Sequence, residues 1–163
     1  MSIKRMPPRL CEYPFWSSQQ LRFADTDRHG HISNAVFAVL CQNARMELLC
    51  DRQRVPMPEN AHFVIARLVL EFLGEMHWPG TVEIGTRIER VGRSSLTLGQ
   101  ALFIEERRVA TAESTVVLID ARSRKSMPLP SETVDALLST RQRYDQLPAL
   151  SPSLASGGSV ARS

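Results

Sequence analysis

The densest group of polar and ionisable side chains in the chain is the segment DTDRHGHISN, residues 25–34. It contains two carboxylates, Asp25 and Asp27, and two imidazoles, His29 and His31. A carboxylate at the start of a helix can act as nucleophile or general base on a carbonyl carbon, because the unpaired helix N–H groups polarise the carbonyl oxygen. This segment is therefore the first candidate for a catalytic site.

Other chemistries fit the sequence less well. Two histidines and two aspartates in an irregular loop are a weak metal pattern, and His62 and His77 lie far away in the sequence, so we expect no metal. The three cysteines form no CxxC pair, and the nucleophile-elbow pattern GxSxG is absent from the sequence. An aspartate before a helix is also a common cap or turn residue, so a structural role stays open for Asp25 and Asp27.

The carboxylates of this loop can lie at a helix N-terminus only if a helix begins directly after the loop. Residues 34–50 predict that helix, with its cap at residues 33–34. Its first two turns, AVFAVLC at residues 35–41, are apolar throughout, so we expect other elements to enclose that end. The second half regains a polar face with Arg45 and Glu47, so we expect that end to reach solvent.

Strands account for most of the remaining pattern. Aromatic residues mixed with polar ones predict a strand at residues 13–24, and β-branched and large apolar residues predict another at residues 62–73. Apolar and polar residues then alternate in three successive segments, which predicts an antiparallel meander. These segments are residues 81–89, 94–104 and 109–119, with a turn at 105–108, and a short helix from Ser131 to about residue 143 follows them.

The 163 residues suit one domain, which we place at residues 13–145. It follows an irregular lead-in at residues 1–12 and precedes a Ser/Gly/Pro-rich tail at residues 146–163 that we expect to be disordered. No apolar run approaches the ~20 residues of a membrane-spanning helix, and no secretory signal is visible. We therefore expect a cytoplasmic protein that does not associate with a membrane.

Charge is spread along the chain, with 20 basic and 17 acidic residues and a net charge of +3. Nucleic-acid binding favours a clustered basic face with aromatic residues between the charges, and aromatic residues make up only 6 % here. We therefore expect no nucleic-acid partner. Small anionic ligands need only a few arginines, and Arg90 and Arg93 on either side of Gly92 are candidates to bind phosphate groups.

Two stretches resemble one known family. RFADTDRHGHISNAVFAVLCQNAR resembles the signature of 4-hydroxybenzoyl-CoA thioesterase-like proteins, in which an Asp-x-x-Gly-His-(Val/Ile)-x-Asn segment leads into a central helix. LVLEFLGEMHWPGTVEIGTRIERVGRSSL is similar to the next segment of that family, with its Pro-Gly turn and Arg-Ser-Ser step. The resemblance covers about residues 13–120. It implies the α+β hotdog fold, an antiparallel five- to six-stranded sheet wrapped around a long central helix, plus a short C-terminal helix.

The resemblance also implies hydrolysis of an acyl-CoA thioester to a free acid and coenzyme A. By position, Asp27 looks like the catalytic carboxylate of the family, which attacks the thioester carbonyl or activates water. The backbone N–H of Asn34 matches the oxyanion donor, Gly30 and His31 match positions that shape the loop, and Asp25 fits a structural role. Coenzyme A is then part of the substrate, and no cofactor is expected.

In such enzymes a second segment contacts the phosphates of coenzyme A. Arg93, Ser94 and Ser95 match that segment, and Arg90 is a weaker candidate for the same contact. Hotdog domains of this kind form homodimers, with two sheets joined edge to edge, or homotetramers. The resemblance therefore implies that Asp27 of one chain works beside Arg93 of another.

Two positions depart from the pattern of the family. Phe37 stands where relatives often carry tyrosine, and Ser33 replaces a frequent asparagine, so both can alter the preference for the acyl group. Two alternative functions remain open. One is a non-catalytic acyl-CoA-binding hotdog protein, and the other is a thioesterase that acts on acyl-carrier-protein substrates. Aromatic, short-chain and medium-chain acyl groups all stay open.

Overall fold

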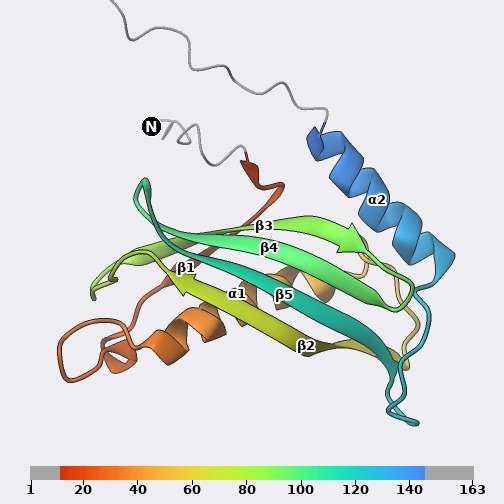
Figure 1. Cartoon of the computed structure of the whole chain (residues 1–163), viewed down its shortest axis with the longest axis horizontal. Coiled ribbons are helices and arrows are strands. Elements are labelled where there is room, and N and C mark those ends of the chain that lie inside the picture. The colour runs from red at the N-terminus through yellow and green to blue at the C-terminus, as the bar shows by residue number, and fades with distance from the viewer. Residues whose placement is uncertain (1–11, 146–163) are drawn as a thin grey trace, which may run out of the picture.

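Five strands form one antiparallel sheet: β1 (Phe15–Gln20), β2 (Ala61–Phe72), β3 (Thr81–Val91), β4 (Ser95–Ile104) and β5 (Arg107–Asp120). The computed structural model describes residues 12–145, so the predicted lead-in before residue 12 and the predicted tail lie outside the described residues. The strands lie in the order β1-β3-β4-β5-β2 (Figure 1). The predicted meander of three alternating segments is confirmed, since β4 pairs with both β3 and β5. β2, which precedes the meander in the chain, pairs with β5 and forms one edge of the sheet.

One face of the sheet holds the long helix α1 (Asn34–Leu49), which runs behind the strands in Figure 1. Apolar side chains of the helix and of the strands share one buried cluster, and this contact removes apolar surface from water. The cluster includes Phe37, Leu40, Cys41 and Ala44 from α1, and Val82, Ile84, Leu102, Ala110 and Ala112 from the sheet. The predicted sheet around a long helix is confirmed.

The second helix, α2 (Ser131–Asp145), lies at the end of the sheet where β3 finishes (Figure 1). Its Leu137 is 1 % exposed and belongs to a cluster with Leu48, Leu49 and Ile88. α2 therefore covers the end of α1 that lies farther from the candidate catalytic loop. Among the described residues, no helix has the length and apolar character needed to cross a membrane.

The first strand is shorter than predicted. It ends at Gln20, and the 3-10 turn η2 (Phe23–Asp25) takes the place of its predicted last residues. The cause is a local competition for backbone groups, because Asp25 accepts hydrogen bonds from both the backbone and the side chain of Arg22 and thereby turns the chain out of the sheet.

The burial of α1 differs from the prediction at both ends. Val39, in the end predicted to be enclosed, is 48 % exposed, and Ala35 is also exposed. Arg45, in the half predicted to reach solvent, is only 5 % exposed and donates a hydrogen bond to Oε1 of Gln100 (3.1 Å). The sheet of one chain covers only one side of the helix, and Arg45 lies on that side.

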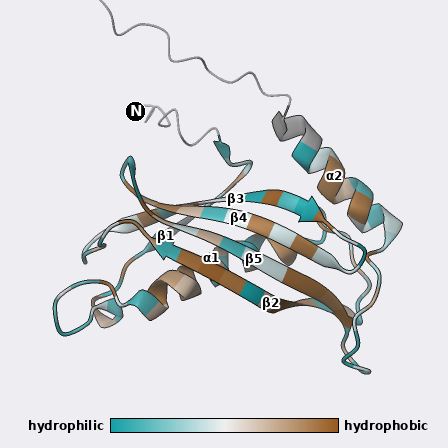
Figure 2. Ribbon diagram, in the orientation of Figure 1, coloured by the Kyte–Doolittle hydropathy of each residue, from teal (hydrophilic) through white to brown (hydrophobic). Residues whose placement is uncertain are grey.

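The edge strand β2 exposes an unusual amount of apolar surface. Figure 2 shows hydrophobic residues along this strand. The exposed large side chains in and next to it are Ile65 (51 %), Leu68 (37 %), Val69 (39 %), Phe72 (49 %) and Leu73 (58 %). A long apolar edge strand is a template for pairing with another chain. β2 is therefore a candidate interface between subunits.

Candidate active site

Asp27 lies in a tight turn between η2 and α1. Its backbone N–H donates to the carbonyl oxygen of His31 (2.8 Å), and the N–H of Gly30 donates to the carbonyl of Asp27 (3.0 Å). Gly30 has φ +78°, a left-handed conformation that glycine adopts without steric cost. Thr26 and Ile32 form an antiparallel bridge at the base of the turn. These backbone contacts hold the Asp27 carboxylate in a defined place.

The carboxylate of Asp27 is ionised at neutral pH. Its Oδ1 accepts hydrogen bonds from the backbone N–H groups of His29 (2.8 Å) and His31 (3.3 Å), and Oδ2 takes part in neither bond. The bond from His29 is the largest cause that lowers the pKa of Asp27 below its ordinary value, and the bond from His31 lowers it further. An exposed, ionised carboxylate is the form that a nucleophile or a general base requires.

The start of α1 follows directly. Ser33 is the N-cap, but its side chain makes no capping hydrogen bond, and its own N–H donates to the backbone oxygen of Asp25 (2.9 Å). The first N–H groups of the helix, beginning with that of Asn34, therefore donate no hydrogen bond to a capping side chain. They lie at the positive end of the helix dipole. The terminus is therefore suited to bind an oxyanion.

Asp25 has a different environment from Asp27. It is 6 % exposed, and its carboxylate contacts the guanidinium of Arg22 at 2.7 Å. Hydrogen bonding from the Arg22 side chain lowers the pKa of Asp25, mainly by stabilising the charged form. A carboxylate engaged in this way holds the turn and is not free to attack a substrate, which fits the structural role expected for Asp25.

Asp27 and Asn34 line the same cavity, whose volume is about 400 Å³. Phe37, at the position where the resemblance leads one to expect tyrosine, is buried and packs against Phe72 with ring centroids 5.1 Å apart. An apolar wall therefore stands beside the carboxylate, as a site for an acyl group requires. The other lining residues are His31, Ile32, Leu73, Gly74 and Glu75.

The predicted phosphate-binding residues lie at the other end of the sheet. The turn of Asp27 adjoins the start of β3, because Ile32 donates its N–H to the carbonyl of Met76 (2.8 Å). Arg93 follows the end of β3, and the eleven residues of that strand span about 33 Å. Within one chain Arg93 is therefore not brought to Asp27. Ser94, Ser95 and Arg90 share the position of Arg93 at this end.

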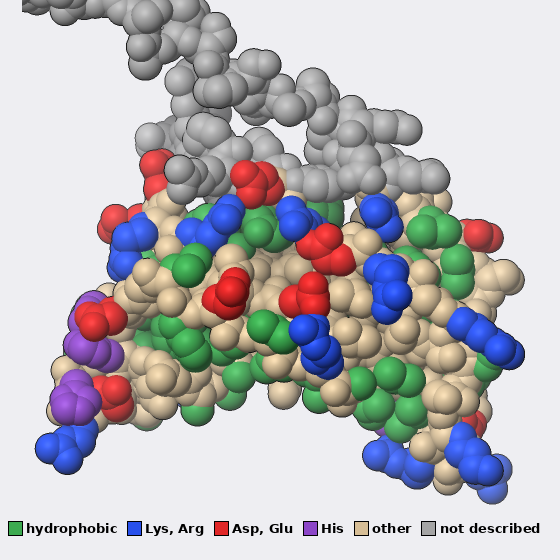
Figure 3. Space-filling view, in the orientation of Figure 1, with side chains coloured by type: hydrophobic (Ala, Val, Ile, Leu, Met, Phe, Trp, Pro, Cys, Tyr) green, Lys and Arg blue, Asp and Glu red, His purple; other side chains and the backbone are tan. Residues whose placement is uncertain are grey.

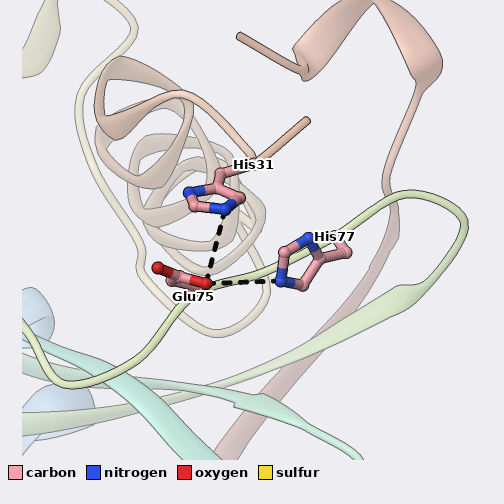
Figure 4. Close-up of side chains that lie close together, drawn as sticks. All are labelled: His31, Glu75 and His77. Atoms are coloured by element: carbon pink, nitrogen blue, oxygen red, sulfur yellow. Dashed lines mark ion pairs between the residues drawn. The ribbon is translucent and has the colours of Figure 1, made fainter. Parts of the chain in front are cut away.

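Glu75 is a functional candidate that the sequence did not indicate, and His77 is one that was set aside because it lies far from the loop in the sequence. His31 and His77 form an isolated antiparallel bridge, and Glu75 lies between their rings (Figure 4). The sequence signal was present in the EMHWPG segment, but no periodicity or motif connects it to the loop of Asp27. His29 lies outside this group, with its ring centroid 6.5 Å from that of His31.

A second cavity of about 400 Å³ lies on the open face of the sheet. Figure 3 shows basic and acidic side chains close together over this face. Arg67 pairs with Glu113, and Arg87 pairs with Glu89 at 2.6 Å. Most charges in this hollow are therefore paired, and the remaining carboxylate, Glu71, accepts a hydrogen bond from the hydroxyl of Thr111 (3.0 Å).

Solved structures place this architecture in the hotdog fold, which confirms the predicted fold class. A thioesterase from Thermus thermophilus, solved with coenzyme A and zinc, superposes with a TM-score of 0.72 at 27 % identity, covering 81 % of this chain and 98 % of the other. A protein from Pseudomonas aeruginosa has the same fold, with a TM-score of 0.72 at 24 % identity over 80 % of this chain and 93 % of its own.

The chain belongs to the thioesterase-like superfamily, whose family model matches residues 21–137. Among curated proteins, the acyl-CoA thioester hydrolase YbgC of Escherichia coli O6:H1 is 28 % identical over 116 residues, which cover 69 % of this chain and 87 % of YbgC. The predicted family resemblance and the predicted enzyme class, a thioester hydrolase, are thereby confirmed. The residues matched by the family model include the loop of Asp27 and all of α1.

Proposed function

We propose that the chain hydrolyses an acyl-CoA thioester to a free carboxylic acid and coenzyme A, with Asp27 as nucleophile or general base. The observation that carries the proposal is the ionised Asp27 carboxylate at the open start of α1, on one cavity, in a member of the thioesterase-like superfamily. The names of two relatives support a CoA ester as substrate, since YbgC is an acyl-CoA thioester hydrolase and the Thermus thioesterase binds coenzyme A.

In the proposed reaction each group has a defined part. Oδ2 of Asp27 attacks the thioester carbonyl, or takes a proton from a water molecule that attacks it. The backbone N–H of Asn34 donates to the oxyanion of the tetrahedral intermediate, which then expels coenzyme A as its thiolate, and in the general-base route the proton on Asp27 passes to that thiolate. If Asp27 is the nucleophile, water cleaves the resulting mixed anhydride and restores the carboxylate. Gly30 and His31 keep the turn in place through the backbone bonds described above.

The proposed active unit is a homodimer joined along β2, which leaves assembly into a homotetramer open. Two β2 strands that pair antiparallel about a two-fold axis place the Asp27 end of one sheet beside the Arg93 end of the other. This arrangement brings the carboxylate and the proposed phosphate contacts to one substrate, although about 33 Å of strand separates them within a chain. Arg93, Ser94, Ser95 and Arg90 would then contact the phosphates of coenzyme A bound at the Asp27 of the partner.

The test of hydrolysis uses a panel of aliphatic and aromatic acyl-CoAs, with release of free thiol as the signal. A trace without substrate corrects for thiols of the protein such as the exposed Cys50. Wild-type turnover should fall by about 100-fold or more in Asp27→Asn, because general-base catalysis contributes about 10²–10⁴-fold. Asp135→Asn, an exposed aspartate on α2, is the matched control and should retain activity.

Three results contradict the proposal in different ways. Full turnover by Asp27→Asn removes Asp27 from the mechanism. Binding of acyl-CoA without turnover by the wild type favours the non-catalytic binding protein. Hydrolysis of acyl-carrier-protein substrates but not of acyl-CoA favours the third function. The panel also identifies the acyl class, which the sequence leaves open.

The shared site has its own test in mixed dimers of Asp27→Asn and Arg93→Gln chains. If each site uses Asp27 of one chain and Arg93 of the other, every mixed dimer contains one native site and one doubly altered site. At substrate concentrations well below KM, where both separate variants are nearly inactive, random exchange makes half of the dimers mixed, so activity should recover to about one quarter of wild type. Activity that stays at the average of the two separate variants contradicts a shared site.

A further inference from the structure

We propose that His31, Glu75 and His77 form a binding site for a divalent transition-metal ion of the zinc type. The proposal does not rest on the proposed hydrolysis. The three side chains come from two loops that are distant in the sequence, and both rings point toward the carboxylate between them (Figure 4). Their candidate ligand atoms all lie within 4.8 Å of one another.

The spacing fits coordination better than direct hydrogen bonding. Nε2 of His31 and Nε2 of His77 each lie 3.5 Å from the same oxygen, Oε2 of Glu75. A strong hydrogen bond between a protonated imidazole and a carboxylate is about 2.7–2.9 Å long. Two ligands of a tetrahedral zinc ion, each about 2.0–2.1 Å from the metal, are about 3.3–3.4 Å apart. These two separations from Glu75 are thus close to those that a bound ion imposes.

The outer contact of His77 matches that of a metal-binding histidine. Its Nδ1 lies 3.3 Å from the carbonyl oxygen of Gly30, which can only accept a hydrogen bond. With the proton on Nδ1, Nε2 keeps its lone pair, and that atom faces Glu75. Metal-bound histidines almost always donate their second ring N–H to a carboxylate, a backbone carbonyl or water in this way.

The backbone holds both loops in register at this point. His31 and His77 form an antiparallel bridge, and the N–H of Ile32 donates to the carbonyl of Met76 between them (2.8 Å). Arg107 donates to the backbone oxygen of Glu75 (3.0 Å), which fixes that segment without using its carboxylate. The two segments that carry the ligands are therefore held next to one another by backbone contacts alone.

The ligand set selects the class of ion. Two imidazole nitrogens and one carboxylate favour zinc and its transition-metal neighbours, whereas magnesium and calcium prefer oxygen ligands throughout. Three protein ligands leave the fourth tetrahedral position to water. The side chains are 39 %, 63 % and 56 % exposed for His31, Glu75 and His77, so an ion can reach them from solvent. The expectation of no metal rested on the weak ligand pattern of the loop and on the distance of His62 and His77 from it in the sequence, and the fold closes that distance for His77.

The experiment titrates zinc into untagged protein by calorimetry, without substrate. Because thiolates also bind zinc, Cys11 and Cys50 are replaced by serine in every variant. We expect one zinc ion per chain, and His77→Gln should weaken binding by about 100-fold or more, since even changes to outer contacts of metal ligands cost 10–100-fold. His62→Gln, which alters a histidine on β2 beside Arg124, should bind as tightly as the parent.

Anomalous diffraction from a zinc-soaked crystal gives an independent readout. A peak within bonding distance of both Nε2 atoms and of Glu75 supports the site. Equal zinc affinity in the parent and His77→Gln, a peak elsewhere only, or no binding by the parent overturns the proposal. None of these measurements uses an acyl-CoA, so their failure is distinct from a failure of the proposed hydrolysis.

Discussion

Replacement of Gln100 by leucine should cost the domain about 3–5 kcal/mol of unfolding free energy, because this side chain joins α1 to the sheet. Gln100 is 2 % exposed. Its Nε2 donates to the carbonyl oxygen of Cys41 (3.0 Å) and to Oγ1 of Thr86 (3.1 Å), and its Oε1 accepts from the guanidinium of Arg45 (3.1 Å). Leucine is similar in size but makes none of these bonds.

The estimate follows from what each partner loses. Arg45 is 5 % exposed and loses the acceptor of a charged hydrogen bond, which is worth about 1.5–3 kcal/mol. Thr86 is 1 % exposed and loses a donor, which adds about 1 kcal/mol, and the Cys41 carbonyl loses one of its bonds. The total is a large part of the roughly 5–15 kcal/mol that stabilises an ordinary domain.

Urea unfolding followed by circular dichroism, at one fixed protein concentration, measures the loss. The matched control is Gln42→Leu, an exposed glutamine on α1, which should change stability by less than about 0.5 kcal/mol. Arg45→Met should be less costly in the Gln100→Leu background than in the wild type, because the unpaired charge is then removed. A loss below about 1 kcal/mol for Gln100→Leu, or purely additive effects, refutes this reasoning.

Three further predictions concern the site and the thiols. Because hydrogen bonds lower the folded pKa of Asp27 below its ordinary value of 3.8, the carboxylate loses its charge only as the pH falls through that lower pKa. The kcat/KM for hydrolysis should therefore stay flat from neutral pH to about pH 5, and a limb with its midpoint above pH 5 contradicts this. Arg93→Gln should raise KM for acyl-CoA but not for an acyl thioester of a short thiol that has no phosphates, whereas Arg122→Gln should change neither; equal effects on both substrates exclude a phosphate contact. Burial raises the pKa of Cys41 to about 11, so a thiol reagent at neutral pH should label the exposed Cys50 first, and Cys41 only after unfolding, as mass spectrometry of peptides shows directly. Rapid labelling of Cys41 in the folded protein contradicts its burial.

The elements of the fold were predictable because they depend on local patterns. Residues 34–50 were predicted as the central helix, and α1 spans Asn34–Leu49. The alternating segments became β3, β4 and β5 with ends within about two residues, because period-2 patterning reports directly which face of a strand is buried. The first strand was predicted too long, because the bond of Arg22 to Asp25 competes with strand pairing and hydropathy does not report it.

The contacts between distant segments were not predictable in this way. Arg45 was expected at the surface because of its charge, yet the fold gives it a partner, Gln100, on β4. Glu75 and His77 join His31 only because a backbone bridge connects two loops that no sequence pattern relates. By contrast, Asp27 and Asn34 share a short motif, so their common cavity follows from the turn and the helix start alone.

Three features of the single chain have one explanation under the proposed homodimer. The helix end next to Asp27 is apolar but exposes Val39, the edge strand β2 exposes Ile65 and Phe72, and Arg93 lies a strand length away from Asp27. A separate cause for each is unnecessary, because a second copy paired along β2 covers the edge strand and supplies the opposite end of its own sheet. The all-apolar start of α1 then has the meaning that the sequence indicated. It is the end of the helix that must be enclosed, and in the proposed homodimer the second chain would do part of the enclosing.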